Sequence, residues 1–454
     1  MAANKKGTKM FGTDGIRGKA NHSPMTGEIA FEIGRAAAHV LRKKDGLNRI
    51  LIGKDTRLSG YMLESALTSG ICSMGTNVVL VGPLPTPGIA FVTRSLRVDA
   101  GVVISASHNP FDDNGIKFFS SDGFKLPDET EAEIEKAMFS KKLGMIRPEG
   151  AGIGKAFRVD DASGRYIEYV KSTFPKGRTL EGMKVVVDCG NGSAYKITPS
   201  VLSELGADVI PINNKPDGLN INENCGATHP EAMQQAVLEN RADIGIAHDG
   251  DADRTLLCDE KGEIIDGDKI MAICARAMKK DGSLKGNAVV ATVMSNIGLE
   301  IFLKKTGIKL YRTNVGDRYV VEEMIRRRCN LGGEQSGHII FLDHNSTGDG
   351  AVTALQALSV MLRTGKSLSR LSSDIQIYPQ VLINVRVPKI KNIEDFPAVL
   401  SSIKKAEKKL ERGRILVRPS GTEPKIRVMV EGDDMDEITT AANEIADTIK
   451  KKMK

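Results

Sequence analysis

One pattern of alternating strands and helices occurs three times along the chain, and it constrains the fold more than any other feature. The first copy begins with the strand NRILIGKD (48–55), continues through a helix at 59–75 and ends in the strand TNVVLVG (76–82). The second copy begins at MKVVVDCGNGSA (183–194), and the third begins at NAVVATVMSN (287–296). Long apolar strands that alternate with helices are typical of α/β units whose sheets are covered on both faces. The repeat therefore predicts three related α/β domains.

Each copy is completed by a further strand that leads into a polar loop. These loops are SASHNP (105–110), DGDADR (249–254) and GEQSGH (333–338). Open α/β sheets bind ligands beyond the carboxyl ends of their strands. We therefore expect the three loops to occupy equivalent places in their domains and to converge on one central cleft.

The C-terminal region follows a different pattern. The segment YPQVLINVRVP (378–388) alternates like a half-buried strand, and RILVRPSGTEPKIRVMVEG (414–432) reads as two strands around a polar turn. Two helices complete this region, which indicates a smaller α+β domain with antiparallel strands. Because 454 residues are too many for one hydrophobic core, we predict four domains, at residues 1–155, 156–257, 258–372 and 373–454.

Composition excludes several classes of protein. Aromatic residues make up only 4% of the chain and tryptophan is absent, which argues against stacking on single-stranded nucleic acid. The net charge of +7 is modest, and it is partly carried by lysine-rich helix faces. Six widely spaced cysteines lack metal-finger spacing, which favours reduced thiols in the cytosol. The sequence has no apolar signal core and no segment of roughly 20 apolar residues. We predict a cytoplasmic protein that binds neither nucleic acid nor membrane.

The loop DGDADR carries three carboxylates at alternate positions, Asp249, Asp251 and Asp253. Carboxylates this close repel one another unless a cation lies between them, and oxygen ligands suit Mg²⁺ better than zinc. A calcium loop of the EF-hand type needs glycine at its sixth position and a helix on each side. Here the sixth position is Arg254 and the flanking segments read as strands. The pattern therefore predicts a magnesium site.

The loop SASHNP places Ser107 and His108 just beyond a buried strand. The nucleophile elbow of serine hydrolases reads G-x-S-x-G, and neither glycine is present here. A hydroxyl near a magnesium site suggests phosphoryl transfer, in which a metal and positive groups neutralise the transferring phosphate. Lys117, in the strand that follows, is a candidate for that charge or for proton exchange. The alternative is a turn serine that only hydrogen-bonds the backbone.

The turn RPSGTEPKIRVM resembles a phosphate cradle. Arg418 and Arg427 can grip phosphate oxygens in bidentate fashion, Ser420 and Thr422 add hydroxyl donors, and Gly421 lets backbone N–H groups approach closely. The P-loop string G-x-x-x-x-G-K-[ST] is absent. The alternative is a hairpin turn with exposed arginines.

Two further motifs are weaker when each is taken alone. In GEQSGH, the carboxylate of Glu334 and the hydroxyl of Ser336 can hold vicinal sugar hydroxyls, and His338 belongs to the residue type that titrates near neutrality. Near the start of the chain, FGTDGIRG combines turn glycines with one cation, Arg17.

Taken in this order, the loops SASHNP, DGDADR, GEQSGH and RPSGTEP resemble those of the α-D-phosphohexomutase family, and the resemblance runs from about Met10 to the C-terminus. The opening FGTDGIRG and Gln335 are most similar to the branch that acts on phosphoglucosamine. The resemblance implies three related α/β domains with mixed sheets, followed by a C-terminal α+β domain. It also implies that Ser107 is a phosphoserine, which ligates Mg²⁺ together with Asp249, Asp251 and Asp253. By the same resemblance, Arg254 would stabilise phosphoryl charge, Arg17 would lie near the phosphoserine, and the proton-transfer or phosphate-contact groups would be His108, Lys117 and His338. Glu334 and Ser336 would bind sugar hydroxyls, and the non-reacting phosphate would be held by Arg418, Ser420, Gly421, Thr422 and Arg427.

The implied reaction interconverts the 6- and 1-phosphates of glucosamine through a 1,6-bisphosphate, for amino-sugar nucleotide and cell-wall precursor synthesis. This reaction would need a small phosphosugar substrate, one Mg²⁺ per subunit, and glucosamine or glucose 1,6-bisphosphate as activator. The resemblance is also compatible with a homodimer. Glucose or mannose phosphates are the nearest rival substrates. The motifs also leave open a magnesium-dependent phosphosugar phosphatase and a non-catalytic sugar-phosphate binding protein. One position departs from many family members, which have glycine in place of Ala252, and alanine is expected to avoid left-handed backbone conformations.

Overall fold

The computed structural model describes residues 9–12, 14–42, 48–388, 392–410, 412–419 and 424–453. The chain divides into two compact units, which are described separately. The first unit contains residues 1–292 and 311–372, and the second contains residues 293–310 and 373–454. In the described part of the chain, none of the helices combines the length and the apolar character needed to span a bilayer.

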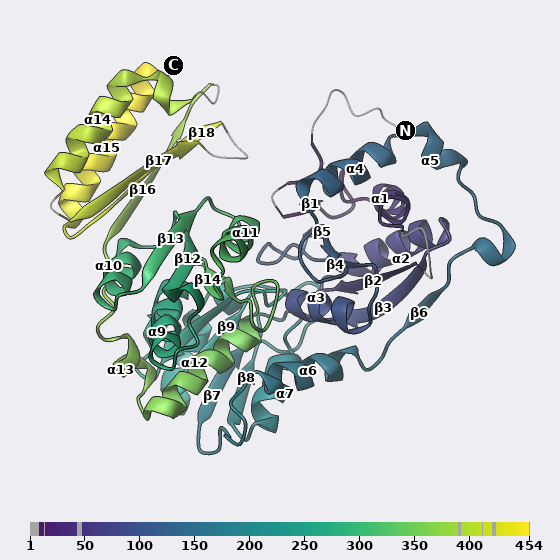
Figure 1. The fold of residues 1–454 in the computed structure, drawn as a ribbon, viewed down its shortest axis with the longest axis horizontal. Coiled ribbons are helices and arrows are strands. Elements are labelled where there is room, and N and C mark those ends of the chain that lie inside the picture. Colours follow the sequence, from purple (N-terminus) through teal and green to yellow (C-terminus); the bar gives the residue numbers. More distant parts are fainter. Residues whose placement is uncertain are drawn as a thin grey trace. The chain divides into compact units, whose positions relative to one another are not determined.

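The first domain is built on a six-stranded mixed sheet with the order β1-β5-β4-β2-β3-β6 (Figure 1). Its elements are β1 (Ile16–Lys19), α1 (Gly27–Val40), β2 (Arg49–Lys54), α2 (Ser59–Cys72), β3 (Asn77–Pro83), α3 (Thr86–Ser95), β4 (Ala100–Ile104), β5 (Asp113–Ser120), α4 (Asp128–Met138), α5 (Lys141–Met145) and β6 (Ala156–Arg158). Strands β4, β2, β3 and β6 pair in parallel, and β5 and β1 continue the sheet in antiparallel fashion. Every residue of β4 is buried, as expected for a strand covered on both faces.

The second domain has a five-stranded sheet with the order β11-β10-β9-β7-β8. Its elements are α6 (Ala162–Ser172), β7 (Lys184–Asp188), α7 (Ile197–Glu204), β8 (Asp208–Ile212), α8 (Glu231–Asn240), β9 (Ile244–His248), β10 (Thr255–Asp259) and β11 (Ile264–Ile265). Strand β7 pairs in parallel with both β8 and β9, whereas β10 pairs antiparallel with β9.

The third domain has a four-stranded sheet with the order β13-β12-β14-β15. Its elements are α9 (Gly267–Lys280), β12 (Ala288–Thr292), α10 (Ile297–Lys305), β13 (Lys309–Thr313), α11 (Asp317–Arg327), β14 (Leu331–Gly333), β15 (Ile339–Phe341), α12 (Gly350–Thr364) and α13 (Leu368–Ser372). Strand β14 is parallel to β12 and antiparallel to β15.

The three polar loops occupy the same topological place, as the repeat predicts. Each loop leaves a strand that pairs in parallel with its inner neighbour and enters a strand that pairs back antiparallel. The connections are β4 to β5, β9 to β10 and β14 to β15. The predicted fold of three related α/β domains with mixed sheets is therefore confirmed.

The second unit contains the C-terminal α+β domain, whose three strands are antiparallel in the order β16-β18-β17. Its elements are β16 (Gln380–Arg386), α14 (Pro397–Lys409), β17 (Gly413–Pro419), β18 (Lys425–Gly432) and α15 (Met435–Lys452). Residues 293–310, which include α10 of the third domain's sequence repeat, also belong to this second unit. The side chain of Asn296 donates to the carbonyl of Tyr378 at 2.9 Å and accepts from its N–H at 3.0 Å.

The sheets continue a few residues past two of the predicted domain limits. Strand β6 begins at residue 156 and joins the first sheet, and the limit at 257 falls inside β10. Strand β6 is a three-residue edge strand, too short for periodicity to reveal it, whereas β10 is an inner strand of the second sheet whose sequence also reads as a strand. The four domain limits themselves stay predictions.

Candidate active site

Ser107 lies in the turn between β4 and β5, and its side chain reaches the second domain. Its hydroxyl donates to Asp249 Oδ2 at 2.6 Å and lies 3.3 Å from His108 Nδ1. The residue is 1% exposed and has a φ of +51°, in the left-handed region that non-glycine residues rarely adopt. This backbone conformation turns the side chain towards the carboxylates of the next loop.

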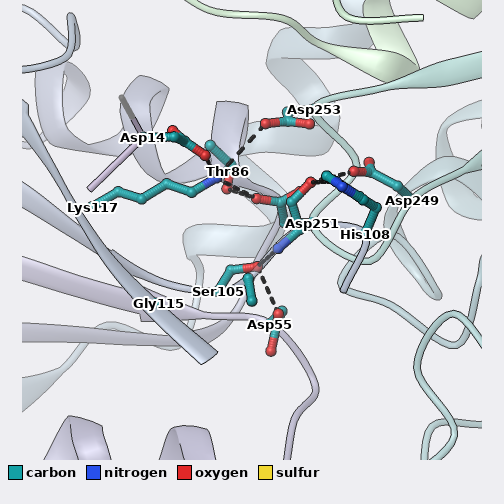
Figure 2. A network of polar contacts seen from close by, with 12 residues as sticks. Asp14, Asp55, Thr86, Ser105, His108, Gly115, Lys117, Asp249, Asp251 and Asp253 are labelled. Carbon is teal, nitrogen blue, oxygen red and sulfur yellow. Dashed lines mark hydrogen bonds and ion pairs between the residues drawn. The ribbon is translucent and has the colours of Figure 1, made fainter. Parts of the chain in front are cut away.

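Asp249, Asp251 and Asp253 alternate along the turn between β9 and β10, and all three are buried. One oxygen from each carboxylate lies within 4.8 Å of the others. Thr86, at the start of α3, donates to Asp251 Oδ2 at 2.7 Å. The three aspartates cluster in the structure, as expected (Figure 2), and Asp249 contacts Ser107.

The charges in this cluster favour a bound cation. Burial and repulsion from the neighbouring aspartates raise the pKa of Asp249 well above its ordinary value and also raise the pKa of Asp253. Asp251 Oδ1 and Asp253 Oδ1 are buried without a hydrogen-bond partner among the described residues. A hard divalent cation bound by oxygen ligands supplies the missing contacts and offsets the repulsion. These donors fit Mg²⁺.

Lys117 extends from β5 into the same cluster. Its ammonium group lies 3.1 Å from Asp251 Oδ2, 3.9 Å from Asp253 Oδ2 and 3.1 Å from Asp14 Oδ2 (Figure 2). Burial alone would lower its pKa, but Asp14 and Asp251 raise that pKa above the ordinary lysine value. Burial would likewise raise the pKa of Asp251, but the ammonium of Lys117 and the hydroxyl of Thr86 hold it at about 2. Lys117 is therefore protonated and positively charged in this site at neutral pH.

Three further charged residues join Lys117, although no role was predicted for them from the sequence. Asp14 pairs with Arg17 and with Lys125, and Lys125 lies 2.6 Å from Asp317 at the start of α11. Arg17 also donates to the carbonyl of Ala106 at 3.5 Å, one residue before Ser107. The motif FGTDGIRG contains both Asp14 and Arg17, and that was the only signal in the sequence. The expected position of Arg17 near Ser107 agrees with this contact.

The loop of the third domain meets the loop of the second. The N–H of Thr255 donates to the carbonyl of Gly337 at 3.1 Å. His338 Nε2 lies 3.6 Å from Asp317 Oδ2 and 3.9 Å from Asp253 Oδ2. Glu334 is held by the N–H of Gly316 at 3.1 Å. Ser336 is exposed on the same loop. The first unit thus brings the three polar loops together, as the sequence predicts.

Two other predicted residues lie at the rim of the aspartate cluster. The N–H of Arg254 donates to Asp249 Oδ1 at 3.2 Å, and its Nε lies 4.0 Å from Asp253 Oδ1. Burial and the nearby charges of Arg254 and Arg17 lower the pKa of His108 to about 4. His108 therefore stands as a neutral imidazole beside the Ser107 hydroxyl at neutral pH.

The expectation for Ala252 is wrong. Its φ is +54°, so this alanine adopts the left-handed conformation that it was expected to avoid. The turn contacts explain why: the N–H of Ala252 donates to the carbonyl of Asp249 at 3.0 Å, and its carbonyl accepts from Gly350 at 3.0 Å. The turn that brings the three carboxylates together imposes this conformation on whichever residue occupies the position.

The second unit contains the two arginines of the predicted phosphate cradle. Arg418 on β17 and Arg427 on β18 are direct cross-strand partners, an arrangement in which like charges destabilise each other unless an anion lies between them. Burial and the charge of Arg427 lower the pKa of Arg418. Arg427 Nε is buried without a partner in the described part of the chain. Ser420, Gly421 and Thr422 lie outside the described residues.

Comparison with known proteins agrees with this architecture, which is that of a phosphohexomutase. The chain matches the phosphoglucomutase/phosphomannomutase α/β/α domains I, II and III over residues 8–145, 164–262 and 266–378, and the C-terminal domain over residues 382–448. The chain belongs to the phosphoglucomutase/phosphomannomutase family.

One curated relative and two solved structures show which members of the family the chain is similar to. The chain is 60% identical over 446 residues to a phosphoglucosamine mutase of Geobacter metallireducens, which covers 98% of this chain and 99% of that one. It is also similar to the crystal structure of a phosphoglucomutase/phosphomannomutase family protein from Burkholderia thailandensis, with a TM-score of 0.79, 23% identity and coverage of 98% and 97%. An N-acetylphosphoglucosamine mutase of Aspergillus fumigatus, solved with GlcNAc-6P and magnesium, matches with a TM-score of 0.69, 18% identity and coverage of 98% and 96%. The two solved structures support the fold.

Proposed function

We propose that this protein interconverts glucosamine 6-phosphate and glucosamine 1-phosphate, with Ser107 as the residue that carries the phosphoryl group. The observation that carries the proposal is the 2.6 Å contact between the buried Ser107 hydroxyl and Asp249, within a cluster of three aspartates. The near-full-length relative named phosphoglucosamine mutase supports the choice of sugar.

In the proposed reaction, phosphorylated Ser107 donates its group to the free hydroxyl of the sugar phosphate. The Ser107 Oγ–P bond breaks, a P–O bond to the sugar forms, and the proton of the sugar hydroxyl passes, through a proton-transfer group of the site, to the released Ser107 oxygen. The resulting 1,6-bisphosphate then turns over and returns its other phosphoryl group to Ser107. Lys117, Arg254 and Arg17 supply positive charge near the transferring group, because phosphoryl transfer depends mainly on positioning and charge neutralisation. His108, Lys117 and His338 are the candidates for proton transfer.

Asp249, Asp251 and Asp253, together with a phosphoserine oxygen, would hold one Mg²⁺. When bound, it would neutralise charge on the transferring phosphoryl group. The Aspergillus fumigatus mutase, whose structure was solved with magnesium, supports this assignment. Glu334 and Ser336 would hold sugar hydroxyls, and Arg418 and Arg427 would hold the phosphate that does not react. A hexose 1,6-bisphosphate would first phosphorylate Ser107.

The free cysteines support a reducing, cytoplasmic location.

The substrate assignment is tested by measuring kcat/KM for the phosphates of glucosamine, glucose and mannose side by side, with Mg²⁺ and a trace of hexose bisphosphate. We expect a preference for glucosamine phosphate of at least about tenfold, equivalent to roughly 1.4 kcal/mol of transition-state discrimination. A preference for glucose or mannose phosphate would retain the mechanism and overturn the assigned sugar.

The carrier residue is tested by Ser107→Ala. We expect the variant to fold normally and to lose nearly all turnover, because the only proposed acceptor of the phosphoryl group is gone. Intact mass spectrometry of purified wild-type protein should show a retained phosphate that is absent from the variant. Turnover by Ser107→Ala at the wild-type rate would remove Ser107 from the mechanism. If the protein were instead a phosphosugar phosphatase, the wild-type assay would yield inorganic phosphate in place of the isomeric sugar phosphate.

A further inference from the structure

A buried arginine outside the predicted set of site residues supports the main chain of the Ser107 loop. Arg57 lies just beyond β2 and is 0% exposed. Its guanidinium donates to the carbonyls of Ser107 at 2.9 Å, Asn109 at 2.8 Å and Asp113 at 3.1 Å, and also to the carbonyl of Pro110. Its Nε donates to Asp55 Oδ2 at 2.8 Å. Four carbonyls of one short loop therefore converge on one side chain.

This arrangement uses the whole donor capacity of the arginine. A guanidinium has five N–H groups in a fixed plane, and Arg57 directs four of them to loop carbonyls and the fifth to Asp55. A lysine offers three donors from a single atom, so it cannot reach four carbonyls and a carboxylate at once. The geometry is specific for arginine.

Asp55 connects the arginine to the serine by a second route. The Ser105 hydroxyl donates to Asp55 Oδ2 at 2.6 Å and accepts from the N–H of Ser107 at 2.9 Å (Figure 2). The N–H and the carbonyl of Ser107 are thus both held by this network. Because Ser107 has a φ of +51°, its backbone stays in a rarely populated region only while the surroundings fix it.

Asn222, from the second domain, contacts the same carbonyls from the other side. Its Nδ2 donates to the carbonyl of Ser107 at 2.9 Å and to that of Asn109 at 3.1 Å. The amide cannot be flipped, because its oxygen would then face two carbonyl oxygens. A Cβ at Gly250 would lie 2.7 Å from the carbonyl oxygen of Ser107 and 2.9 Å from Asn222 Nδ2. The turn that carries the aspartates is thus packed directly against this contact.

We propose that Arg57 and Asn222 are positioning residues for phosphoryl transfer, which hold the Ser107 backbone in its left-handed conformation and so keep the hydroxyl directed at the aspartate cluster. The inference rests on the proposed function, since it assumes that Ser107 carries the phosphoryl group. Neither residue contacts the reacting atoms. Their effect should therefore fall on the transfer step and leave sugar binding nearly unchanged.

The test follows the loading of Ser107 directly. Dephosphorylated protein is mixed with glucose 1,6-bisphosphate and Mg²⁺, and phosphorylation is timed by intact mass. In this step the Ser107 Oγ–P bond forms, the P–O bond to the sugar breaks, and the serine proton passes to the departing sugar oxygen. Arg57→Lys should slow this transfer about 100-fold, the scale of loss caused by a misplaced reacting group, while the KM for sugar phosphate changes less than about threefold.

Arg35→Lys provides the matched control. Arg35 is 2% exposed in the same domain, and it likewise donates to a main-chain carbonyl, that of Leu143 at 2.6 Å. It should load Ser107 at close to the wild-type rate, even where its melting temperature falls. Asn222→Ala removes two donors and leaves Arg57 in place, so it should slow loading less than Arg57→Lys does. It also serves as the test variant where Arg57→Lys does not fold.

Three results would overturn the inference. The first is transfer at the wild-type rate in both Arg57→Lys and Asn222→Ala, and the second is a loss of transfer in Arg35→Lys equal to that in Arg57→Lys. The third is a rise in the KM of Arg57→Lys with an unchanged transfer rate. Failure of the proposed function gives a different result. In that case wild-type protein gains no phosphate, or gains it equally in Ser107→Ala.

Discussion

At the scale of single residues, the site depends on two non-glycine residues whose backbone lies in the left-handed region. Ser107 and Ala252 have φ values of +51° and +54°, and they lie on the two loops that meet at the aspartate cluster. Residues held in sparsely populated regions each cost about 1–3 kcal/mol. The turns that direct Ser107 and the carboxylates towards each other therefore reduce the stability of the fold.

Ala252→Gly should recover part of that cost. Glycine adopts positive φ without the steric penalty of a Cβ, so the free energy of unfolding should rise by up to about 1 kcal/mol, with turnover retained. Denaturation in urea measures the change. Ala236→Gly, in the interior of α8, is the opposite case and should cost about 1 kcal/mol. If both variants lose stability equally, Ala252 is not strained.

His344 should contribute to sensitivity to acid. Burial lowers the pKa of this histidine below 6.5, although neighbouring Asp343 raises it. Below pH 6.5, the unfolded chain takes up a proton that the folded chain resists, so the free energy of unfolding falls as the pH falls. His344→Gln should therefore lose less stability than wild type between about pH 8 and pH 5. Equal losses in urea titrations at the two pH values would contradict this. Part of the acid sensitivity should remain in His344→Gln, because His108 and His248 also have lowered pKa values, of about 4.

At the scale of elements, helices α1 and α2 pack closely because two glycines lie where they cross. A Cβ on Gly34 would lie 2.6 Å from the carbonyl oxygen of Leu67, and a Cβ on Gly70 would lie 2.2 Å from that of Phe31. Both neighbours are backbone atoms, which cannot move aside as a flexible side chain can. The helices cover the sheet that carries Ser107, so their separation sets the packing of the first domain.

Gly70→Ala should destabilise the protein by about 1–3 kcal/mol, the usual cost of overpacking. Gly164→Ala is the matched control, because Gly164 lies in helix α6 with nothing within 4 Å of an added Cβ. This control should gain about 0.5–1 kcal/mol from the better helix propensity of alanine. Differential scanning calorimetry on the two variants distinguishes steric crowding from propensity, since propensity alone predicts a gain in both.

At the scale of the whole molecule, the chain is two compact units. The aspartate cluster and the contacts of its three loops belong to the first unit, and the Arg418–Arg427 pair belongs to the second. Proteins with more than one compact unit often depart from a single two-state transition. A ligand of one unit should then act mainly on the transition of that unit.

Mg²⁺ should raise the unfolding transition of the first unit and leave that of the second nearly unchanged. A free concentration about 100 times the Kd adds about 2.7 kcal/mol by mass action. Calorimetry with Mg²⁺ and with EDTA measures the effect, and Asp253→Asn should abolish the response. That variant should not destabilise the metal-free protein, because it removes a carboxylate whose neighbours repel it. An equal shift of both transitions would count against the assignment of the site to the first unit.

The sequence by itself determined the features that lie close together along the chain. The threefold strand–helix repeat predicted the three α/β domains. Asp249, Asp251 and Asp253 lie close together because one tight turn joins them. The sequence pattern also placed Ser107 just after a buried strand, at the place in its sheet that the polar loops of the other two domains occupy in theirs. Alternation and spacing report local structure, and these features are local.

Tertiary structure alone decided which distant side chains complete the site. Asp14, Lys125 and Asp317 come from three separate segments, and Arg57 reaches the Ser107 loop from the end of β2. Thr86 and Asn222 reach across between domains in the same way. The contacts of Asp317, Thr86 and Asn222 depend on how neighbouring domains pack, and those of Asp14 and Arg57 depend on packing within the first domain. Neither kind of packing leaves a periodic signal in the segments that meet. Local sequence shapes each loop separately, and the packing of the domains assembles the loops into one site.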